Sequence, residues 1–222
     1  MPAQPAYPLV LTNLAAVRCV VVGGGAVAER KARDLLAGGA RPCVISPDLT
    51  AALASWRDAG RLEHVARRYR AGDLAGAFLA IAATDERATN AAVAAEAAGI
   101  CALVNVADDP PACNFHTAAA VRRGDLLLAV STSGGSPALT ARIRRELEQR
   151  YGEEYGRLLK LLRRLRQGAA RTLPTEKRSA LWRRLVSDPM LGWLRDGEDA
   201  QAEQFALALL EELAAENDKV TG

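Results

Sequence analysis

Three small residues follow a short hydrophobic run near the start of the chain, at a spacing that suits phosphate binding. The run Cys19–Val22 is followed by Gly23, Gly25 and Ala28 in the pattern G-x-G-x-x-A. The first glycine permits a tight strand-to-helix turn, the second lets the backbone approach a pyrophosphate, and the small third residue lets the helix pack on the strand. The helix N-terminus then offers free N–H groups to phosphates. The pattern predicts a dinucleotide-binding turn that includes Gly24, and the alternative is an ordinary glycine-rich turn.

The end of the next predicted strand bears on which dinucleotide is bound. That strand ends in Ser46, Pro47 and Asp48, where an NAD-binding fold usually has Asp or Glu for the ribose hydroxyls. Ser46 can form one hydrogen bond there, and Asp48 lies two residues further on. No arginine follows immediately to meet a 2′-phosphate, so NAD is favoured over NADP. Thr84 ends a later strand and is expected at the same ligand-binding edge, although it suits a plain helix cap equally well.

A carboxylate follows the last predicted parallel strand. Asn105 and Asp108 belong to the stretch at the end of that strand, so we expect Asp108 beside the nicotinamide and Asn105 among the cofactor contacts. A carboxylate there can take a proton while hydride leaves a substrate C–H bond for the cofactor. Aspartate is also a common turn former before proline. On residue types alone the two interpretations are equally supported.

A third candidate site precedes a helix in the second half of the chain. Two glycines separate the hydroxyl residues Ser131, Thr132 and Ser133 from Ser136. Ser136 suits the N-cap of that helix, and a proline follows as its first residue. Hydroxyls, glycines and exposed N–H groups can together receive carboxylates, and arginines flank the stretch at positions 122, 123, 142, 144 and 145. A polycarboxylate ligand suits this surface, and the alternative is a well-capped helix without a ligand.

Strands and helices alternate through the first half of the chain. We expect strands at 9–11, 18–22, 42–46, 62–69, 76–84 and 99–108, and helices at 27–37, 49–59 and 86–98. This alternation predicts an α/β domain with a doubly wound parallel sheet of the Rossmann type over residues 1–113.

The pattern changes after the parallel sheet. Two extended segments at 115–121 and 125–131 and a helix at 137–150 predict a small α+β segment over residues 114–150. This segment has little core of its own, so we expect it to pair with a second copy. Residues 151–222 are predicted to form a helical domain, with breaks near 168–174 and 187–189.

Composition places the chain among ordinary soluble proteins. Of its 222 residues, 50% are hydrophobic and 25% charged, and no apolar run approaches the roughly 18 residues that span a bilayer. Without a recognisable signal peptide, the expected location is the cytoplasm. Four widely spaced cysteines and two histidines indicate no metal site. Residues 142–195 carry 15 Lys/Arg against 6 Asp/Glu, which favours an anionic partner or substrate.

Together these motifs resemble the precorrin-2 dehydrogenase family, the oxidase component of siroheme synthesis. The matching residues follow the order found in that family and cover about 7–150, while the helical remainder matches only in character. The matching pieces are residues 7–9, 21–32, 45–47, 80–85, 90, 105–108, 113–115 and 131–139.

The resemblance implies NAD-dependent oxidation of precorrin-2 to sirohydrochlorin, in a homodimer whose central segment exchanges between subunits. It places the catalytic carboxylate at Asp108 and adds Ala26, Val27 and Pro47 to the cofactor contacts. Some members also insert ferrous iron. The family usually has an apolar residue and a proline where this chain has His116, Thr117 and Ala118. His116 is a candidate contact to the tetrapyrrole or a metal, with a surface histidine as the alternative.

Two other functions compete with this prediction. A non-enzymatic NAD-sensing regulatory module would share the glycine turn and the sheet, but it would not need residues 105–108 or the loop before the helix at 137. The second competing function is that of a chelatase that has lost oxidase activity. Incubation with precorrin-2 and NAD, followed by ferrous iron or cobalt, separates all three.

Overall fold

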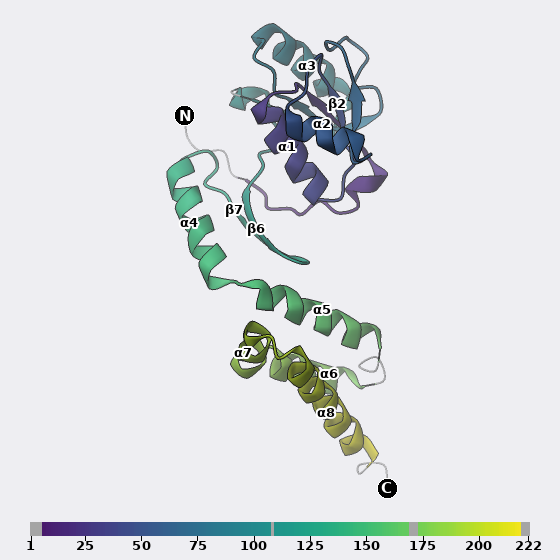
Figure 1. The fold of residues 1–222 in the computed structure, drawn as a ribbon, viewed down its shortest axis with the longest axis vertical. Coiled ribbons are helices and arrows are strands. Elements are labelled where there is room, and N and C mark those ends of the chain that lie inside the picture. Colours follow the sequence, from purple (N-terminus) through teal and green to yellow (C-terminus); the bar gives the residue numbers. More distant parts are fainter. Residues whose placement is uncertain (1–5, 108, 169–172, 219–222) are drawn as a thin grey trace. The chain divides into compact units, whose positions relative to one another are not determined.

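The computed structural model describes residues 6–107, 109–168 and 173–218 (Figure 1). The chain divides into two compact units, with the boundary between Thr117 and Ala118. We call them the N-terminal unit and the C-terminal unit, and each is described by itself. Among the described residues, no helix combines the length and the apolar character needed to cross a membrane.

The N-terminal unit is built on a five-stranded sheet in the order β3-β2-β1-β4-β5, in which every pair is parallel. The strands are β1 (Arg18–Val22), β2 (Cys43–Ile45), β3 (Glu63–Val65), β4 (Ala77–Ala82) and β5 (Leu103–Val106). Strand order reverses between β1 and β4. In open parallel sheets, ligands bind outside the carboxyl ends of the strands at such a switch point.

Helices cover both faces of this sheet. They are α1 (Ala26–Ala37), α2 (Ala51–Asp58) and α3 (Arg87–Ile100), and two 3-10 turns occur at Leu14–Ala16 and Pro110–Ala112. Alternate residues of β1 face opposite ways: Val21 packs with α1 and α2, whereas Val20 and Val22 pack with α3. Ala28 and Ala32 of α1 are fully buried, because small side chains let the helix lie close to the strands.

Three sequence-based boundaries need correction. Residues 9–11 form no strand, and Leu9 and Val10 are 59% and 67% exposed. The strand expected at 62–69 is limited to β3, because Arg67 turns away to pair with Asp73. The strand expected from residue 99 begins at Leu103, since α3 continues to Ile100.

The strand expected from residue 115 starts later than predicted, and the residue before it, Asn114, covers the outer edge of β5. Asn114 N–H donates to Val104 O (3.0 Å). Its side chain accepts from Val104 N–H (2.7 Å) and donates to Ala102 O (2.9 Å). One residue therefore satisfies the edge of β5 as a further strand would, and the next strand begins only at Ala119.

The C-terminal unit begins with a hairpin and a helix that bury little. Strands β6 (Ala119–Arg123) and β7 (Leu126–Val130) pair antiparallel and are followed by α4 (Pro137–Arg150). Within these three elements, all described, Val121 alone is buried. The hairpin turn packs closely on α5 (Glu153–Gln167), where a Cβ on Gly156 would come within 2.7 Å of Arg123 O.

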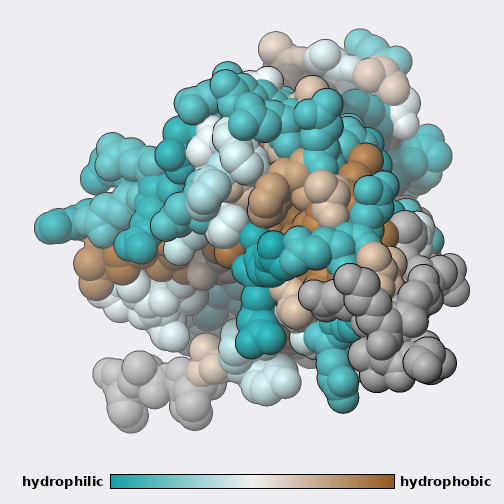
Figure 2. Space-filling model, turned by 90° about the horizontal axis from the view of Figure 1, so that it is seen from below, coloured by the Kyte–Doolittle hydropathy of each residue, from teal (hydrophilic) through white to brown (hydrophobic). Residues whose placement is uncertain are grey.

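The remaining helices form a core of their own. Leu158 of α5 packs with Leu181 of α6 (Thr175–Leu185), Met190 of α7 (Asp188–Asp196) and Ala206 of α8 (Asp199–Asp218). Two of the breaks between these helices were expected. A third, at Gly197 with φ +83°, was missed. Figure 2, viewed from below Figure 1, shows hydrophobic side chains surfacing between hydrophilic ones on that face.

Candidate functional site

Each glycine of the turn after β1 has a different steric role. Gly23 adopts φ +123°, and a Cβ there would overlap the Ala83 carbonyl group, lying 2.7 Å from its carbon. A Cβ on Gly24 would lie 2.6 Å from Ser46 Oγ. A Cβ on Gly25 would meet nothing within 4 Å. Gly23 and Gly24 are therefore needed for close backbone packing, while Gly25 faces open space.

Backbone hydrogen bonds hold this turn at the carboxyl edge of the sheet. Gly23 N–H donates to Ile45 O (2.9 Å), and Thr50 N–H donates to Gly24 O (3.0 Å). Helix α1 then starts at Ala26, and Ala26 and Val27 are exposed in its first turn. The first N–H groups of a helix have no intrahelical acceptor. An open N-terminus beside a glycine without a Cβ fits the pyrophosphate of a dinucleotide.

The residues predicted to contact the ribose lie beside this turn. Ser46 is buried, and its carbonyl oxygen is 2.9 Å from His64 Nε2, which donates to it. Pro47 and Asp48 are exposed. The structure thus brings Ser46 and the backbone of Asp48 against Gly24, with the Asp48 side chain at the surface.

Thr84 lies next to the glycine turn, and its hydroxyl is engaged by the protein. The hydroxyl donates to Asn90 Oδ1 (2.8 Å) and accepts from Glu86 N–H (3.2 Å). Helix α3 has Glu86 as its N-cap residue. Thr84 therefore braces the turn before α3 without being its cap.

Asn105 is buried, and its amide contacts the segment that follows β5. Its Nδ2 donates to Phe115 O (3.0 Å) and lies 3.5 Å from Cys113 Sγ. Lys31 of α1 donates to Thr117 Oγ1 (2.9 Å). Burial and the neighbouring Arg30 lower the pKa of Lys31. The Asn105 bond therefore holds the backbone before His116, and the Lys31 bond engages the side chain after it; His116 itself is exposed.

Asp108, the predicted catalytic residue, lies outside the described residues. Its neighbours place the start of its loop: Ala107 N–H donates to Ala82 O (2.8 Å), and Cys113 Sγ donates to Val106 O (3.3 Å). Both contacts lie at the carboxyl ends of β4 and β5, on the same edge as Gly23.

The hydroxyl loop before α4 belongs to the C-terminal unit, whereas the glycine turn belongs to the N-terminal unit. Ser136 caps α4 by accepting from Leu139 N–H (3.2 Å), as expected. Thr132 Oγ1 accepts from Ser136 N–H (3.1 Å) and lies 3.0 Å from Thr140 Oγ1. Ser131 and Ser133 are exposed, and Ser133 adopts a left-handed conformation (φ +51°).

The arginines near this loop are not equivalent. Arg142 pairs with Glu146, and Arg144 with Glu148, along α4. Arg123 donates to Glu148 O (3.0 Å) and Tyr151 O (2.8 Å), which joins the hairpin to the end of α4. The others flanking the loop, Arg122 and Arg145, are exposed.

No group of three His, Cys, Asp or Glu side chains that could hold a metal ion gathers in the described part of the chain. The four cysteines are free thiols, and burial raises the pKa of Cys19, Cys43 and Cys101.

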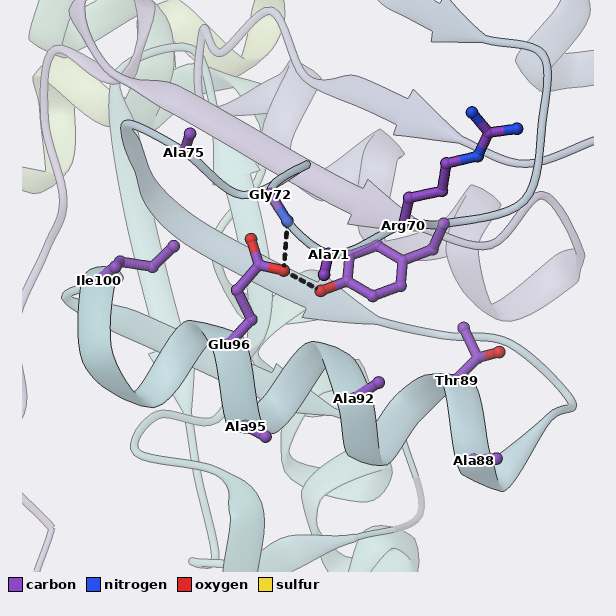
Figure 3. A pocket seen from close by; sticks show the side chains of 11 residues that line it. Arg70, Ala71, Gly72, Ala75, Ala88, Thr89, Ala92, Ala95, Glu96 and Ile100 are labelled. Carbon is purple, nitrogen blue, oxygen red and sulfur yellow. Dashed lines mark hydrogen bonds between the residues drawn. The ribbon is translucent and has the colours of Figure 1, made fainter.

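A separate groove of about 830 Å³ lies between α3 and the loop before β4 (Figure 3). Its one carboxylate, Glu96, accepts from Tyr69 OH and from the N–H groups of Gly72 and Leu74 (2.9 and 3.0 Å). Burial tends to raise the pKa of Glu96, but these hydrogen bonds outweigh it and the pKa is lowered. Alanines make up much of the remaining lining, together with Arg70 and Thr89.

Sequence reasoning missed the contacts that Asn90 and Lys31 make. Asn90 stood out only as an amide among alanines in the first turn of a helix, and Lys31 as a basic residue on a helix that also buries alanines. Both were part of the matching motifs, but their partners Thr84 and Thr117 are identified only by the fold.

Family models match three successive stretches of the chain. A model of NAD(P)-binding domains matches residues 10–119. A model described as the central region of sirohaem biosynthesis proteins matches 123–150, and one described as the sirohaem synthase dimerisation region matches 154–210. The model of the dimerisation region therefore covers the helical part of the chain, and the model of the central region covers most of residues 114–150.

Curated relatives and a solved structure agree with these models. The siroheme synthases of Chromobacterium violaceum and Azotobacter vinelandii are each 39% identical, over 88% and 89% of this chain. The chain spans less than half the length of these relatives, 42% and 43%. The structure of SirC, a precorrin-2 dehydrogenase, matches with a TM-score of 0.75 and 28% identity, covering 93% of this chain and all of that one. The chain belongs to the siroheme synthase family, with an NAD(P)-binding domain as its first region.

Proposed function

We propose that this chain oxidises precorrin-2 to sirohydrochlorin with NAD as the acceptor. The observation that carries the proposal is the cradle at the sheet edge, where Gly23 and Gly24 pack against backbone and Gly25 leaves the N-terminus of α1 open. The similarity to a precorrin-2 dehydrogenase over the whole of that protein supports it.

In this proposal each residue at the sheet edge has a distinct task. The N–H groups of the α1 first turn, at Ala26 and Val27, bind the pyrophosphate, and Ser46 to Asp48 line the ribose. NAD supplies the hydride acceptor. The oxidation removes one hydride and one proton from the substrate, and Asp108 takes the proton. The exposed Asp48 carboxylate disfavours a 2′-phosphate by charge repulsion, which supports NAD over NADP.

The substrate carries several carboxylates, and the protein offers groups that can receive them. We assign this role to Ser131, Thr132, Ser133 and Ser136 before α4, and to His116. The exposed Arg122 and Arg145 add positive charge near that loop in the chain. A homodimer completes the proposal, with domains at 1–113, 114–150 and 151–222.

Two finer elements belong to the same proposal. Insertion of ferrous iron into sirohydrochlorin would use the same tetrapyrrole site, with iron as a substrate. Four free thiols suit a reducing cytoplasm. An NAD-sensing module is the competing function, and it predicts NAD binding without any turnover of precorrin-2.

The decisive experiment replaces Asp108 and uses its neighbour as the control. Asp108→Asn keeps the shape but removes the charge, so turnover of precorrin-2 should fall by about 10²–10⁴-fold, the usual contribution of a general base. NAD affinity should stay near wild type. The matched control is Asp109→Asn, because Asp109 is exposed and makes no side-chain cap bond to the 3-10 turn that follows.

Absorbance of the tetrapyrrole follows the reaction, and calorimetry follows NAD. Wild-type turnover in Asp108→Asn would show that Asp108 is a turn residue only. If the wild-type protein binds NAD but never oxidises precorrin-2, the sensing module replaces the enzyme. Ferrous iron added after oxidation shows whether the same chain completes siroheme.

A further inference from the structure

Asn90 makes an unusual set of hydrogen bonds to a single residue. It lies in the first turn of α3 and is 8% exposed. Its Oδ1 accepts from Thr84 N–H (3.1 Å) and Thr84 Oγ1 (2.8 Å), and its Nδ2 donates to Thr84 O (2.9 Å). One side chain thus satisfies every polar group of Thr84. The Thr84 peptide groups cannot rotate without leaving these partly buried polar groups unpaired.

The backbone held by Asn90 is the surface on which Gly23 rests. A Cβ on Gly23 would lie 2.7 Å from Ala83 C and 3.3 Å from Thr84 N. Ala83 N–H also donates to Val22 O (2.8 Å). This bond joins the turn that follows β4 to the turn that follows β1, one residue before Gly23. Backbone packs on backbone here, with no flexible side chain between to absorb a shift. A displacement of Thr84 therefore displaces Gly23 and the start of α1.

We propose that Asn90 is a positioning residue for the dinucleotide. It holds the Ala83–Thr84 backbone, which in turn fixes Gly23 and the open N-terminus of α1, and it does so without touching the cofactor. The inference rests on the proposed NAD site and deepens it. It also assigns the Thr84 hydroxyl to the protein, because Asn90 and Glu86 already engage it.

The same helix carries a second anchor that serves as a matched control. Glu96, six residues after Asn90, also makes three hydrogen bonds and accepts all of them, from Tyr69 OH and from the N–H groups of Gly72 and Leu74. Figure 3 shows the contact with Gly72. The loop it holds lies at the opposite edge of the sheet, since Arg18 at the start of β1 donates to Asp73 O (3.1 Å). Removing either side chain breaks the same number of hydrogen bonds, but only Asn90 supports the glycine turn.

The test compares Asn90→Ala with Glu96→Ala in the full chain. Both variants should lower the free energy of unfolding. Asn90→Ala should weaken NAD binding about tenfold or more, because small misplacements of binding groups are costly, while turnover at saturating NAD is largely retained. Glu96→Ala should bind NAD as the wild type does. Equal NAD affinities for Asn90→Ala and wild type overturn the inference, and so does an equal loss in both variants.

Two further variants keep the inference testable if Asn90→Ala does not fold. Asn90→Asp keeps both acceptor contacts but sets an oxygen against Thr84 O, so NAD binding should weaken and stay weak in about 1 M salt, where charge effects are screened. A loss that disappears in high salt overturns the inference.

Thr84→Val removes the hydroxyl and keeps both backbone bonds to Asn90. It should weaken NAD binding less than Asn90→Ala does, and an equal loss would make the hydroxyl a direct contact and overturn the inference. Failure of the proposed NAD site looks different, because the wild-type chain itself would then not bind NAD. Failure of the proposed oxidation would leave NAD binding to the wild type without turnover of precorrin-2.

Discussion

The N-terminal unit and the central segment, which comprises β6, β7 and α4 (residues 119–150), stabilise their folds in opposite ways. In the N-terminal unit both faces of the sheet are covered, and Val20, Val21 and Ile81 are at most 1% exposed. In the central segment Val121 alone is buried, and Leu139 of α4 is 48% exposed. One region contains its own core, and the other presents apolar side chains at its surface.

This difference separates two kinds of function. The N-terminal unit carries its candidate ligand site at a sheet edge that lies outside its core, so the site can change while the core stays intact. The central segment keeps its apolar side chains available for another surface. We expect a ligand site in the first region and an association surface in the second.

The largest expected effect is the loss of NAD binding in a variant whose hydrophobic core is unchanged. Gly25→Asp adds bulk and negative charge where a pyrophosphate would lie, and NAD binding should be abolished. The free energy of unfolding should hardly change, because a side chain at Gly25 meets nothing within 4 Å and its φ of −84° suits any residue. Calorimetry and urea denaturation measure the two quantities. Unchanged NAD affinity would remove the cofactor from this turn.

A large effect on stability is expected from the core of the N-terminal unit. Ile81→Ala deletes a side chain that is 1% exposed, and such deletions cost about 2–5 kcal/mol. Leu128→Ala, in half-buried β7, should cost less in the isolated chain. Fluorescence of Trp56 follows the first unit once the tryptophans at 182 and 193 are replaced. Equal losses in both variants would contradict the contrast between the regions.

Association should depend on the central segment and on protein concentration. Leu139→Asp should weaken the dimer by at least about a hundredfold, because a symmetric interface loses the same contact twice. Leu207→Asp is the matched control, since Leu207 of α8 is 45% exposed and lies within the matched dimerisation region. Light scattering distinguishes the dimer from a 23.6 kDa monomer. Dissociation by Leu207→Asp alone would move the interface to the helical region.

The smallest expected effect is a pH dependence in the N-terminal unit. Hydrogen bonds from Arg67, both 2.7 Å long, and from Arg70 N–H lower the pKa of Asp73. A carboxylate with a lowered pKa contributes stability above its unfolded pKa of about 4, and this stability is lost as pH falls through the folded value. Melting temperatures of the wild type should therefore fall more steeply below about pH 4 than those of Asp73→Asn. Parallel pH profiles would show that the pair is not stabilising.

Much of the N-terminal unit could be predicted because the residue preferences of each segment agree with the alternation of strands and helices along the chain. The glycine turn, the buried β1 and the helix that follows were expected within one residue of their observed bounds. The apolar run at 9–11 has the same composition as a strand but no neighbouring strand to pair with, and pairing is not visible in sequence. Gly197 ends α7 in a left-handed conformation, whereas Gly38 and Gly168 end α1 and α5 at negative φ.

The sequence predicts which residues lie at the candidate site, but it does not predict their hydrogen-bond partners. Gly23 and Ser46 were expected at one edge from strand order alone, and the structure places them there. That Asn105 bonds Phe115 O, or that Asn90 bonds Thr84, depends on side-chain directions set by packing. A helical asparagine among alanines looks the same in sequence whether it faces solvent or a turn. Asp108 and the roles of the hydroxyl loop stay predictions.

The side chain of Asn114 has a consequence for how the protein behaves when it is concentrated. Open strand edges invite foreign strands and begin aggregation. On the β5 side the Asn114 amide occupies the backbone groups that a foreign strand would use. On the β3 side the strand has three residues, and Glu63 pairs there with Arg41. We therefore expect fibril growth, if it is forced, to start from the hairpin of β6 and β7, and deamidation of Asn114 to add a second starting point on the sheet.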